Sequence, residues 1–200
     1  MSITILSRKY ESGKNGPGTI SSGAGDAGGQ SYGTFQFASA GGLSSSVATY
    51  VKQSKYRERF KGTIPATADF NKVWKQIALE EPQDFEEDQE AYIRILLYNP
   101  LVKSANILGL NPDNRSNALQ NVLFSMAVQH GPGGGNSILK KIAMNKALSA
   151  YTDEELIKAI YAERGRKNDS GVLVYFSKCS PQVQASVANR FVNEQKDALD

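Results

Sequence analysis

The chain has 200 residues, of which 40% are hydrophobic and 22% charged, and its net charge is +3. This length and composition predict one compact domain over residues 1–200 and exclude extended disorder. No apolar run approaches the roughly 20 residues that a membrane helix needs. The first residues lack the basic start and apolar stretch of a signal peptide. We therefore expect synthesis in the cytoplasm without a cleaved signal.

The first predicted elements are a short helix and a long glycine-rich loop. Apolar residues at helical spacing predict a helix over residues 2–12 that stops at Gly13. Residues 13–42 then hold more than half of the 18 glycines and almost no large aliphatic residues. We predict a loop there, with short strands around Ser31–Phe37. A loop of this length inside a compact domain is usually functional.

From about residue 43 onward the pattern is mostly helical. Periodicity and capping signals predict helices over residues 44–55, 67–78, 82–97, 116–130 and 136–150, one starting at Thr152, and one over 180–198. Thr152–Glu155 has the form of a capping box. The expected architecture is one mainly helical domain with a glycine-rich insertion near its start.

Charge is distributed unevenly along the chain. Residues 80–90 contain seven acidic residues and no basic one, so the rest of the chain carries +10. A basic body suits an anionic polymer such as peptidoglycan or nucleic acid. The alternative is an ordinary solvated surface with scattered lysines. The acidic segment itself receives no functional assignment.

Two residue types that occur once exclude several kinds of site. Cys179, the one cysteine, excludes an internal disulfide and a cysteine-based zinc site, and we expect it to serve packing. His130, the one histidine, excludes multi-histidine metal sites and leaves a serine or cysteine triad a single possible base. The sequence also lacks a Gly-x-Ser-x-Gly elbow. Triad chemistry is therefore disfavoured.

Glu11 is the first candidate for chemistry because it falls in the last turn of the first predicted helix. The negative end of the helix dipole disfavours ionisation there, and packing beside Tyr10 would remove solvent. Both effects raise the pKa of a carboxyl group, which suits a general acid near neutral pH. The alternative is an ordinary surface glutamate.

Asp26 is the second candidate, and no other acidic residue lies between it and Glu11. Glycines on both sides allow sharp turns and leave a short acid open to a cleft. Glycoside hydrolysis uses two carboxyl groups: one protonates the leaving oxygen, and the other activates water or stabilises the cation. The alternative for Asp26 is an Asx turn.

The segment Gln30–Phe37 alternates polar and aromatic residues at strand period. One face would present hydroxyl and amide groups to sugar hydroxyls and N-acetyl groups, while Phe35 and Phe37 would pack into the core. The side chains expected to contact the saccharide are Ser31, Tyr32, Thr34 and Gln36.

Gln129 and His130 end an apolar helix just before Gly131-Pro132. We expect them to line the substrate cleft, with a helix-capping role for His130 as the alternative. The glycines that follow do not form a phosphate loop, because the Gly-x-x-x-x-Gly-Lys-Ser/Thr pattern is missing.

Several blocks of the chain resemble one family. It is the lysozyme-like C-terminal effector domain of type VI secretion spike proteins, together with related phage endolysins of the lysozyme superfamily. The similar blocks span nearly the whole chain and are Tyr10–Gly13, Gly16–Gly23, Gly25–Gln36, Val128–Gly133, Ser180–Val187 and Arg190-Phe191.

The resemblance implies a mainly α-helical, lysozyme-like α+β fold and cleavage of the peptidoglycan glycan strand by a muramidase-type hydrolase. Glu11 would be the general acid, Asp26 the second carboxylate, and the polar residues named above would line or support the saccharide cleft. No metal or other cofactor is implied. We expect a monomer that binds peptidoglycan, with no nucleic-acid partner and no stable membrane insertion.

Because no spike portion precedes Met1, we expect a free-standing endolysin or virion-associated hydrolase that acts in the periplasm or cell wall after release. Other readings stay open. They are a lytic transglycosylase that uses Glu11 alone, a chitosanase, a cell-wall or nucleic-acid binding module, and a structural virion protein.

Overall fold

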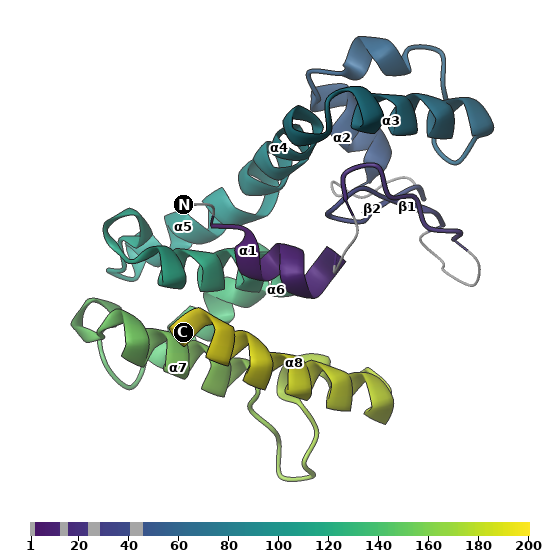
Figure 1. Ribbon diagram of the computed structural model, residues 1–200. Helices are drawn as coiled ribbons and strands as arrows, with labels where there is room; N and C mark the ends of the chain where they lie inside the picture. The colour runs from purple at the N-terminus through teal and green to yellow at the C-terminus, as the bar shows by residue number, and fades with distance from the viewer. Residues whose placement is uncertain (1–2, 13–15, 24–28, 41–45) are drawn as a thin grey trace. The chain divides into compact units, whose positions relative to one another are not determined.

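The computed structural model describes residues 3–12, 16–23, 29–40 and 46–200, and the chain divides into two compact units. Unit 1 consists of Met1–Tyr10 together with Leu97–Asp200, and unit 2 consists of Glu11–Leu96 (Figure 1). Whether the two units act as the single domain expected from the sequence stays a prediction.

Unit 1 is helical in its described part. The first helix begins as α1 (Ile5–Ser7) and continues as the π-helix η1 (Arg8–Ser12), so the boundary between the units falls inside η1. The other α-helices of unit 1 are α5 (Asn99–Ile107), α6 (Asn117–Ala143), α7 (Asp153–Arg164) and α8 (Pro181–Leu199). Short 3-10 helices lie at Pro112–Asn114, Leu148–Ala150 and Val174–Phe176.

Helix α6 is the centre of unit 1, since α1, α5, α7 and α8 all pack against it. Its apolar stripe is fully buried, as expected for a helix covered on several sides. The core side chains of this helix are Leu119, Val122, Leu123, Phe124, Met126, Ile138 and Leu139. Gly131 interrupts the helical geometry with φ 67° and ψ 166°, and Pro132 follows it. Helix α6 therefore consists of two helical segments separated at Gly131, where the sequence predicts the first one to end, and the second begins before the predicted residue 136.

Capping signals in the sequence are reproduced in both units. The Thr152 side chain accepts a hydrogen bond from Glu155 N, and the Glu155 carboxylate accepts one from Thr152 N, which completes the predicted capping box. Thr67 caps α3 (Ala68–Glu80), and Ser180 caps α8 just before Pro181. Helix α5 was not predicted, although Pro100 at its start is a typical initiation signal.

Unit 2 combines a small sheet with helices. Strands β1 (Ser31–Tyr32) and β2 (Phe37–Ala38) pair antiparallel, with Tyr32 opposite Phe37. The helices are α2 (Val47–Gln53), α3, α4 (Pro82–Ile93), a 3-10 turn at Arg57–Phe60 and a π-helical turn at Arg94–Tyr98 that runs into unit 1. The aromatic rings at the core of unit 2 belong to Tyr32, Phe37, Tyr50, Phe70, Trp74 and Phe85.

The acidic segment of residues 80–90 forms most of α4 and part of it holds unit 2 together. The Asp88 carboxylate accepts hydrogen bonds from Tyr50 Oη and Ser54 Oγ, both at 2.6 Å. Glu81 accepts one from Tyr56 Oη at 2.9 Å. These carboxylates are scaffold groups, which accounts for acids that the sequence left unassigned.

The prediction of a mainly α fold with a short hairpin after the first helix is confirmed. Among the residues that the structure describes, no helix is both long enough and apolar enough to cross a bilayer.

Candidate functional site

Gln129 and His130 lie together in unit 1 on the side chain of Arg164, which is completely buried. Arg164 Nη2 donates to Gln129 Oε1 at 2.7 Å, and Arg164 Nε donates to His130 Nε2 at 3.3 Å. The imidazole is therefore an acceptor at Nε2, which leaves its proton on Nδ1. Among the residues that the structure describes, the hydrogen bond of His130 is made with this guanidinium.

Aromatic rings enclose His130 and set its protonation state. The rings packed against it, at centroid distances of 5.5–6.3 Å, are those of Tyr175, Phe176 and Phe191. Burial, followed by the charges of Arg164 and Arg190, lowers the pKa of His130 to about 3. The imidazole is neutral near pH 7, so it orients neighbouring groups and is not poised to take up a proton.

A second buried charge, Glu194, completes this cluster. Glu194 is fully buried on α8, and its carboxylate lies 3.7 Å from Arg164 Nη2 and 3.1 Å from Arg190 Nε. Ser125 Oγ donates to the same carboxylate. One buried acid thus faces two guanidinium groups, an arrangement in which removal of any member leaves uncompensated charge.

The same face of α8 holds the turn of the first helix that precedes Glu11. Tyr10 Oη donates to the Asp197 carboxylate, which also pairs with Lys9 Nζ, and Arg190 lies 5.7 Å from the centroid of the Tyr10 ring. Burial and the hydrogen bond to Asp197 raise the pKa of Tyr10, while Lys9 and Tyr10 lower the pKa of Asp197. The backbone is therefore fixed one residue before Glu11.

The two predicted catalytic carboxyl groups themselves are outside this description. The backbone of Glu11 belongs to η1, at the end of the first helix as predicted, but its side chain lies outside the described part of the structure. Asp26 falls in residues 24–28, which also lie outside the described residues. Their catalytic roles stay predictions.

Tyr32 in unit 2 is completely buried and does not form an exposed face with its neighbours. Its hydroxyl oxygen lies 2.6 Å from Asn71 Oδ1 and 2.9 Å from Gln30 Oε1, with its single proton donated to one of them, and it accepts from Ala66 N at 2.9 Å. These contacts connect Tyr32 to Asn71 of α3 and to Ala66, so the hydroxyl has a structural role within unit 2. Any effect of Tyr32 on saccharide binding would therefore be indirect.

Thr34 is also buried, and its partners tie the glycine-rich segment to α3 and α4. Gln89 Oε1 accepts from Thr34 N at 3.1 Å, and Gln89 Nε2 donates to Pro17 O at 3.1 Å. Trp74 Nε1 donates to the same carbonyl at 2.8 Å, and Thr34 Oγ1 donates to Glu86 at 2.8 Å. Gln89 therefore joins two parts of the glycine-rich segment, one on each side of residues 24–28.

Ser31 and Gln36 are the two half-buried members of the predicted saccharide face. Ser31 N donates to Ser21 Oγ at 2.7 Å, and Gln36 Nε2 donates to Gly33 O at 2.8 Å. The expectation that Tyr32, Thr34 and Gln36 share one open strand face is wrong, because a turn follows Gly33 and Gln36 adopts φ 54°. Whether these residues contact saccharide stays a prediction.

Sequence reasoning missed the residues that organise the buried charges of unit 1, namely Arg164, Arg190, Glu194 and Asp197. It also missed Gln89, which joins the glycine-rich segment to α4 in unit 2. A signal was present for two of them. Arg164 continues the buried stripe of Ile157, Ile160 and Tyr161 on α7, and Glu194 follows buried Phe191 on α8. A charged residue on the apolar stripe of each of two helices indicates a buried ion pair.

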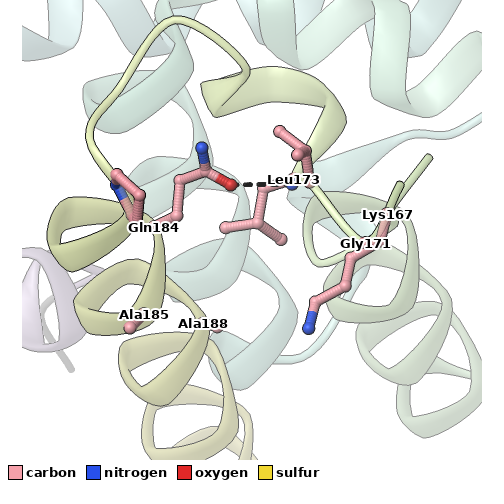
Figure 2. A pocket seen from close by; sticks show the side chains of 8 residues that line it. Lys167, Gly171, Leu173, Gln184, Ala185 and Ala188 are labelled. Carbon is pink, nitrogen blue, oxygen red and sulfur yellow. Dashed lines mark hydrogen bonds between the residues drawn. The ribbon is translucent and has the colours of Figure 1, made fainter. Parts of the chain in front are cut away.

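Unit 1 also contains a small cavity of about 290 Å³ beside the start of α8 (Figure 2). Gln184 Oε1 accepts from Leu173 N at 3.1 Å, and Gln184 Nε2 donates to Cys179 O at 3.0 Å. Both polar atoms of the amide therefore hold the loop before α8. Within the described residues, no group of three or more His, Cys, Asp or Glu side chains could hold a metal ion.

Comparison with known proteins places the chain in a family. Residues 3–195 match the family model described as type VI secretion system spike protein VgrG3-like, C-terminal. The chain is also similar to the type VI secretion system spike protein VgrG3 of Vibrio cholerae, with 33% identity over 97% of this chain. That match spans 18% of the relative's length. The chain therefore belongs to the VgrG3-like C-terminal family of type VI secretion spike proteins.

Proposed function

We propose that this chain is a peptidoglycan hydrolase of the muramidase type, a lysozyme-superfamily enzyme. Protonated Glu11 donates its proton to the glycosidic oxygen, and the Asp26 carboxylate directs water or stabilises the oxocarbenium-like transition state. The leaving sugar departs with a free hydroxyl group, and water supplies the new hydroxyl at the cleaved carbon.

The observation that carries this proposal is that α8 binds Lys9 and Tyr10, the two residues directly before Glu11. A general acid must be held in a defined position relative to the bond it protonates. Tyr10, directly before Glu11, is bound to Asp197 and packed on Arg190. π-Helical turns such as Arg8–Ser12 occur frequently at functional sites.

The state of His130 also supports a carboxyl-based mechanism. The one histidine of the chain is neutral, enclosed by rings and hydrogen-bonded to Arg164. It has no carboxylate partner among the described residues and accepts rather than donates at Nε2, so it lacks the features of a triad base. Carboxyl groups are the remaining acid–base candidates in the glycine-rich region.

The membership of the VgrG3-like C-terminal family supports a proposal for the place of action. A relative that is a type VI secretion spike protein favours delivery into a target bacterium over release as a free-standing endolysin or virion component. We propose that the chain acts on the target's cell wall in the periplasm. Its substrate partner there is the glycan strand of peptidoglycan.

The test is digestion of purified sacculi followed by mass spectrometry of the soluble products. Hydrolysis adds one water per cleaved bond, and reducing ends identify which of the two alternating glycosidic bonds is cut. Glu11→Gln removes the donated proton and should lower the rate by about 10²–10⁴-fold while the fold is retained. Near-normal lysis by this variant would refute the role of Glu11.

A matched control is Glu58→Gln. Glu58 is an exposed glutamate whose ion pair is with its neighbour Arg57. The same chemical change there should leave lysis unaffected. Equal losses in the two variants would indicate a general effect of charge on sacculus binding and would contradict the assignment of Glu11.

The digest also separates the other enzymatic readings. A lytic transglycosylase leaves 1,6-anhydro ends without added water and would tolerate Asp26→Asn. A chitosanase would prefer a deacetylated glucosamine polymer. Binding to sacculi without any product would identify a cell-wall binding module and reject the hydrolase.

A further inference from the structure

A groove in unit 1 lies between the C-terminal end of α6 and α7. It has a volume of about 400 Å³, at the small end of the roughly 300–1,000 Å³ range of ligand sites. Its floor includes small apolar side chains such as Ala162. The polar and aromatic residues that line it are Lys141, Asn145, Tyr151, Glu163 and Arg166.

Contacts with Glu163 and Tyr175 fix the position of the Arg166 side chain at one side of this groove. Arg166 Nε lies 3.0 and 2.9 Å from the two oxygens of the Glu163 carboxylate. Tyr175 Oη donates to that carboxylate at 2.6 Å. The charges of Arg166 and Glu163 offset each other, and the Tyr175 hydroxyl also bonds the Arg166 guanidinium, so the N–H groups that remain are those not used by Glu163 and Tyr175. A guanidinium oriented in this way is ready for a carboxylate.

Lys141, in the last turn of α6, and Asn145, in the turn that follows α6, also line the groove. Both are exposed, and neither side chain has a partner within the described ranges of the chain. Unit 1 as a whole carries 14 basic and nine acidic residues in its sequence, an excess of positive charge that favours an anion. The groove therefore offers the ammonium group of Lys141, the remaining N–H groups of the Glu163-paired Arg166, and the Asn145 amide.

Tyr151 supplies an aromatic wall whose position is fixed by its backbone. Arg115 Nη1 donates to Tyr151 O at 2.9 Å and to Asp153 Oδ1 at 2.9 Å. Lys146 Nζ lies 4.5 Å from the centroid of the Tyr151 ring and pairs with Glu155 at 3.1 Å. Pre-arranged walls of this kind lower the entropy cost of binding a small ligand.

We propose that this groove binds the carboxylate-bearing peptide stems of peptidoglycan. The inference rests on the proposed function, because it adds recognition of the peptide to cleavage of the glycan. Arg166 and Lys141 pair with a stem carboxylate, Asn145 bonds a peptide group, and Tyr151 with the alanine floor accommodates a small side chain. Stem peptides fit because they consist of short residues with several free carboxylates.

The direct test is a titration of the full chain with the synthetic stem tetrapeptide L-Ala-γ-D-Glu-diaminopimelate-D-Ala, followed by NMR or calorimetry. Lys141→Glu reverses a charge in the groove and should weaken binding at least about tenfold, the value of one charge-assisted hydrogen bond. Lys140→Glu is the matched control, since Lys140 is the exposed neighbour on α6 that does not line the groove. It should change the affinity less than twofold.

Several outcomes would overturn the proposal. Equal weakening by Lys140→Glu and Lys141→Glu would show unspecific attraction to a basic surface. Equal binding of the fully amidated peptide would show that carboxylates are not recognised. Absence of binding at millimolar peptide would exclude the stem peptide as a ligand of the groove.

A kinetic comparison keeps this inference separate from the proposed function. Lys141→Glu should raise KM several-fold on intact sacculi with kcat unchanged, and should change nothing on glycan strands stripped of their peptides. Equal effects on both substrates would refute peptide recognition. If the unmodified chain cleaves neither substrate, the hydrolase proposal fails, and the titration still decides whether the groove binds stems.

Discussion

Arg164 Nε donates a hydrogen bond of 3.3 Å to Nε2 of His130, and burial of this imidazole together with the charge of Arg164 keeps the one histidine of the chain neutral. A protonated imidazole would have no lone pair for this bond and would lie against a cation. The His130–Arg164 pair therefore couples the stability of unit 1 to pH.

The first prediction concerns stability between pH 7 and pH 5. The pKa of His130 is about 3 in the folded chain, against an ordinary value of 6.5. Protonation of His130 therefore favours the unfolded chain. The contribution of the neutral His130 to the free energy of unfolding is complete above pH 6.5 and is lost as the pH falls from 6.5 towards 3. His130 alone should cost about 2 kcal/mol between pH 7 and pH 5.

His130→Gln, which keeps an acceptor for Arg164 but does not titrate, should remove that loss. Urea unfolding of both proteins at the two pH values measures it. Because the chain has no second histidine, the difference between them has one source. An equal loss of stability in the variant and the unmodified chain would contradict a neutral, buried His130.

Much of the helical scaffold could be predicted because its signals are local. The capping box at Thr152 and the Ser180-Pro181 start of α8 depend on a few neighbouring residues, and both occur as predicted. The mainly α class follows from the same periodicity. Local signals also placed Glu11 in the last turn of the first helix.

The organisation of the clusters could not be predicted, because it depends on contacts between distant segments. Arg164 and Glu194 meet only when α7 and α8 pack together, and Figure 1 shows these helices side by side. The failed expectation of an open strand face at Tyr32 has a different cause. A period of two applies only to a continuous strand, and the turn after Gly33 ends β1 after two residues.

The second prediction concerns the buried acid of unit 1. Glu194→Ala leaves Arg164 and Arg190 buried without their carboxylate and should cost about 3–5 kcal/mol in the free energy of unfolding. Glu154→Ala is the control, since it removes an exposed pair with Lys158 and should cost less than about 0.5 kcal/mol. Urea midpoints of the two variants test this, and similar midpoints would argue against a buried charge cluster.

The third prediction concerns the junction of the glycine-rich segment with α4. Gly33 has φ 72°, and a Cβ there would lie 2.2 Å from Gln89 Oε1. Gly62 has φ 79° with nothing within 4 Å of its Cβ position. Both substitutions to alanine cost about 1–2 kcal/mol for the left-handed backbone, and Gly33→Ala should cost about 1–3 kcal/mol more for the overlap.

Thermal unfolding of Gly33→Ala and Gly62→Ala measures the difference. Only Gly33→Ala should also lower the rate of wall lysis, because Gln89 joins Thr34 to Pro17 across the segment that contains Asp26. Equal destabilisation of the two variants would show that the Gln89 side chain moves away from the new Cβ with no loss in the free energy of unfolding. Unchanged lysis by Gly33→Ala would separate this junction from the chemistry.

The last prediction tests whether α8 positions the proposed acid through Tyr10. Tyr10→Phe removes the donor to Asp197 but keeps the ring near Arg190. The variant should lose about 1 kcal/mol of stability, the usual net value of one hydrogen bond. Since the turn before Glu11 would gain freedom, kcat on sacculi should fall about tenfold, equivalent to about 1.4 kcal/mol in the barrier, with KM unchanged.

Tyr56→Phe is the matched control for this effect. Tyr56 Oη donates to the Glu81 carboxylate at 2.9 Å in unit 2, so the same hydroxyl-to-carboxylate bond is lost away from the first helix. Its stability loss should be similar, while kcat should stay unchanged. If Tyr10→Phe keeps full kcat, or if both variants lose activity alike, the bond between Tyr10 and Asp197 serves stability alone. A fall in kcat confined to Tyr10→Phe would require that the turn is held for catalysis, because the two variants differ only in where the bond is lost.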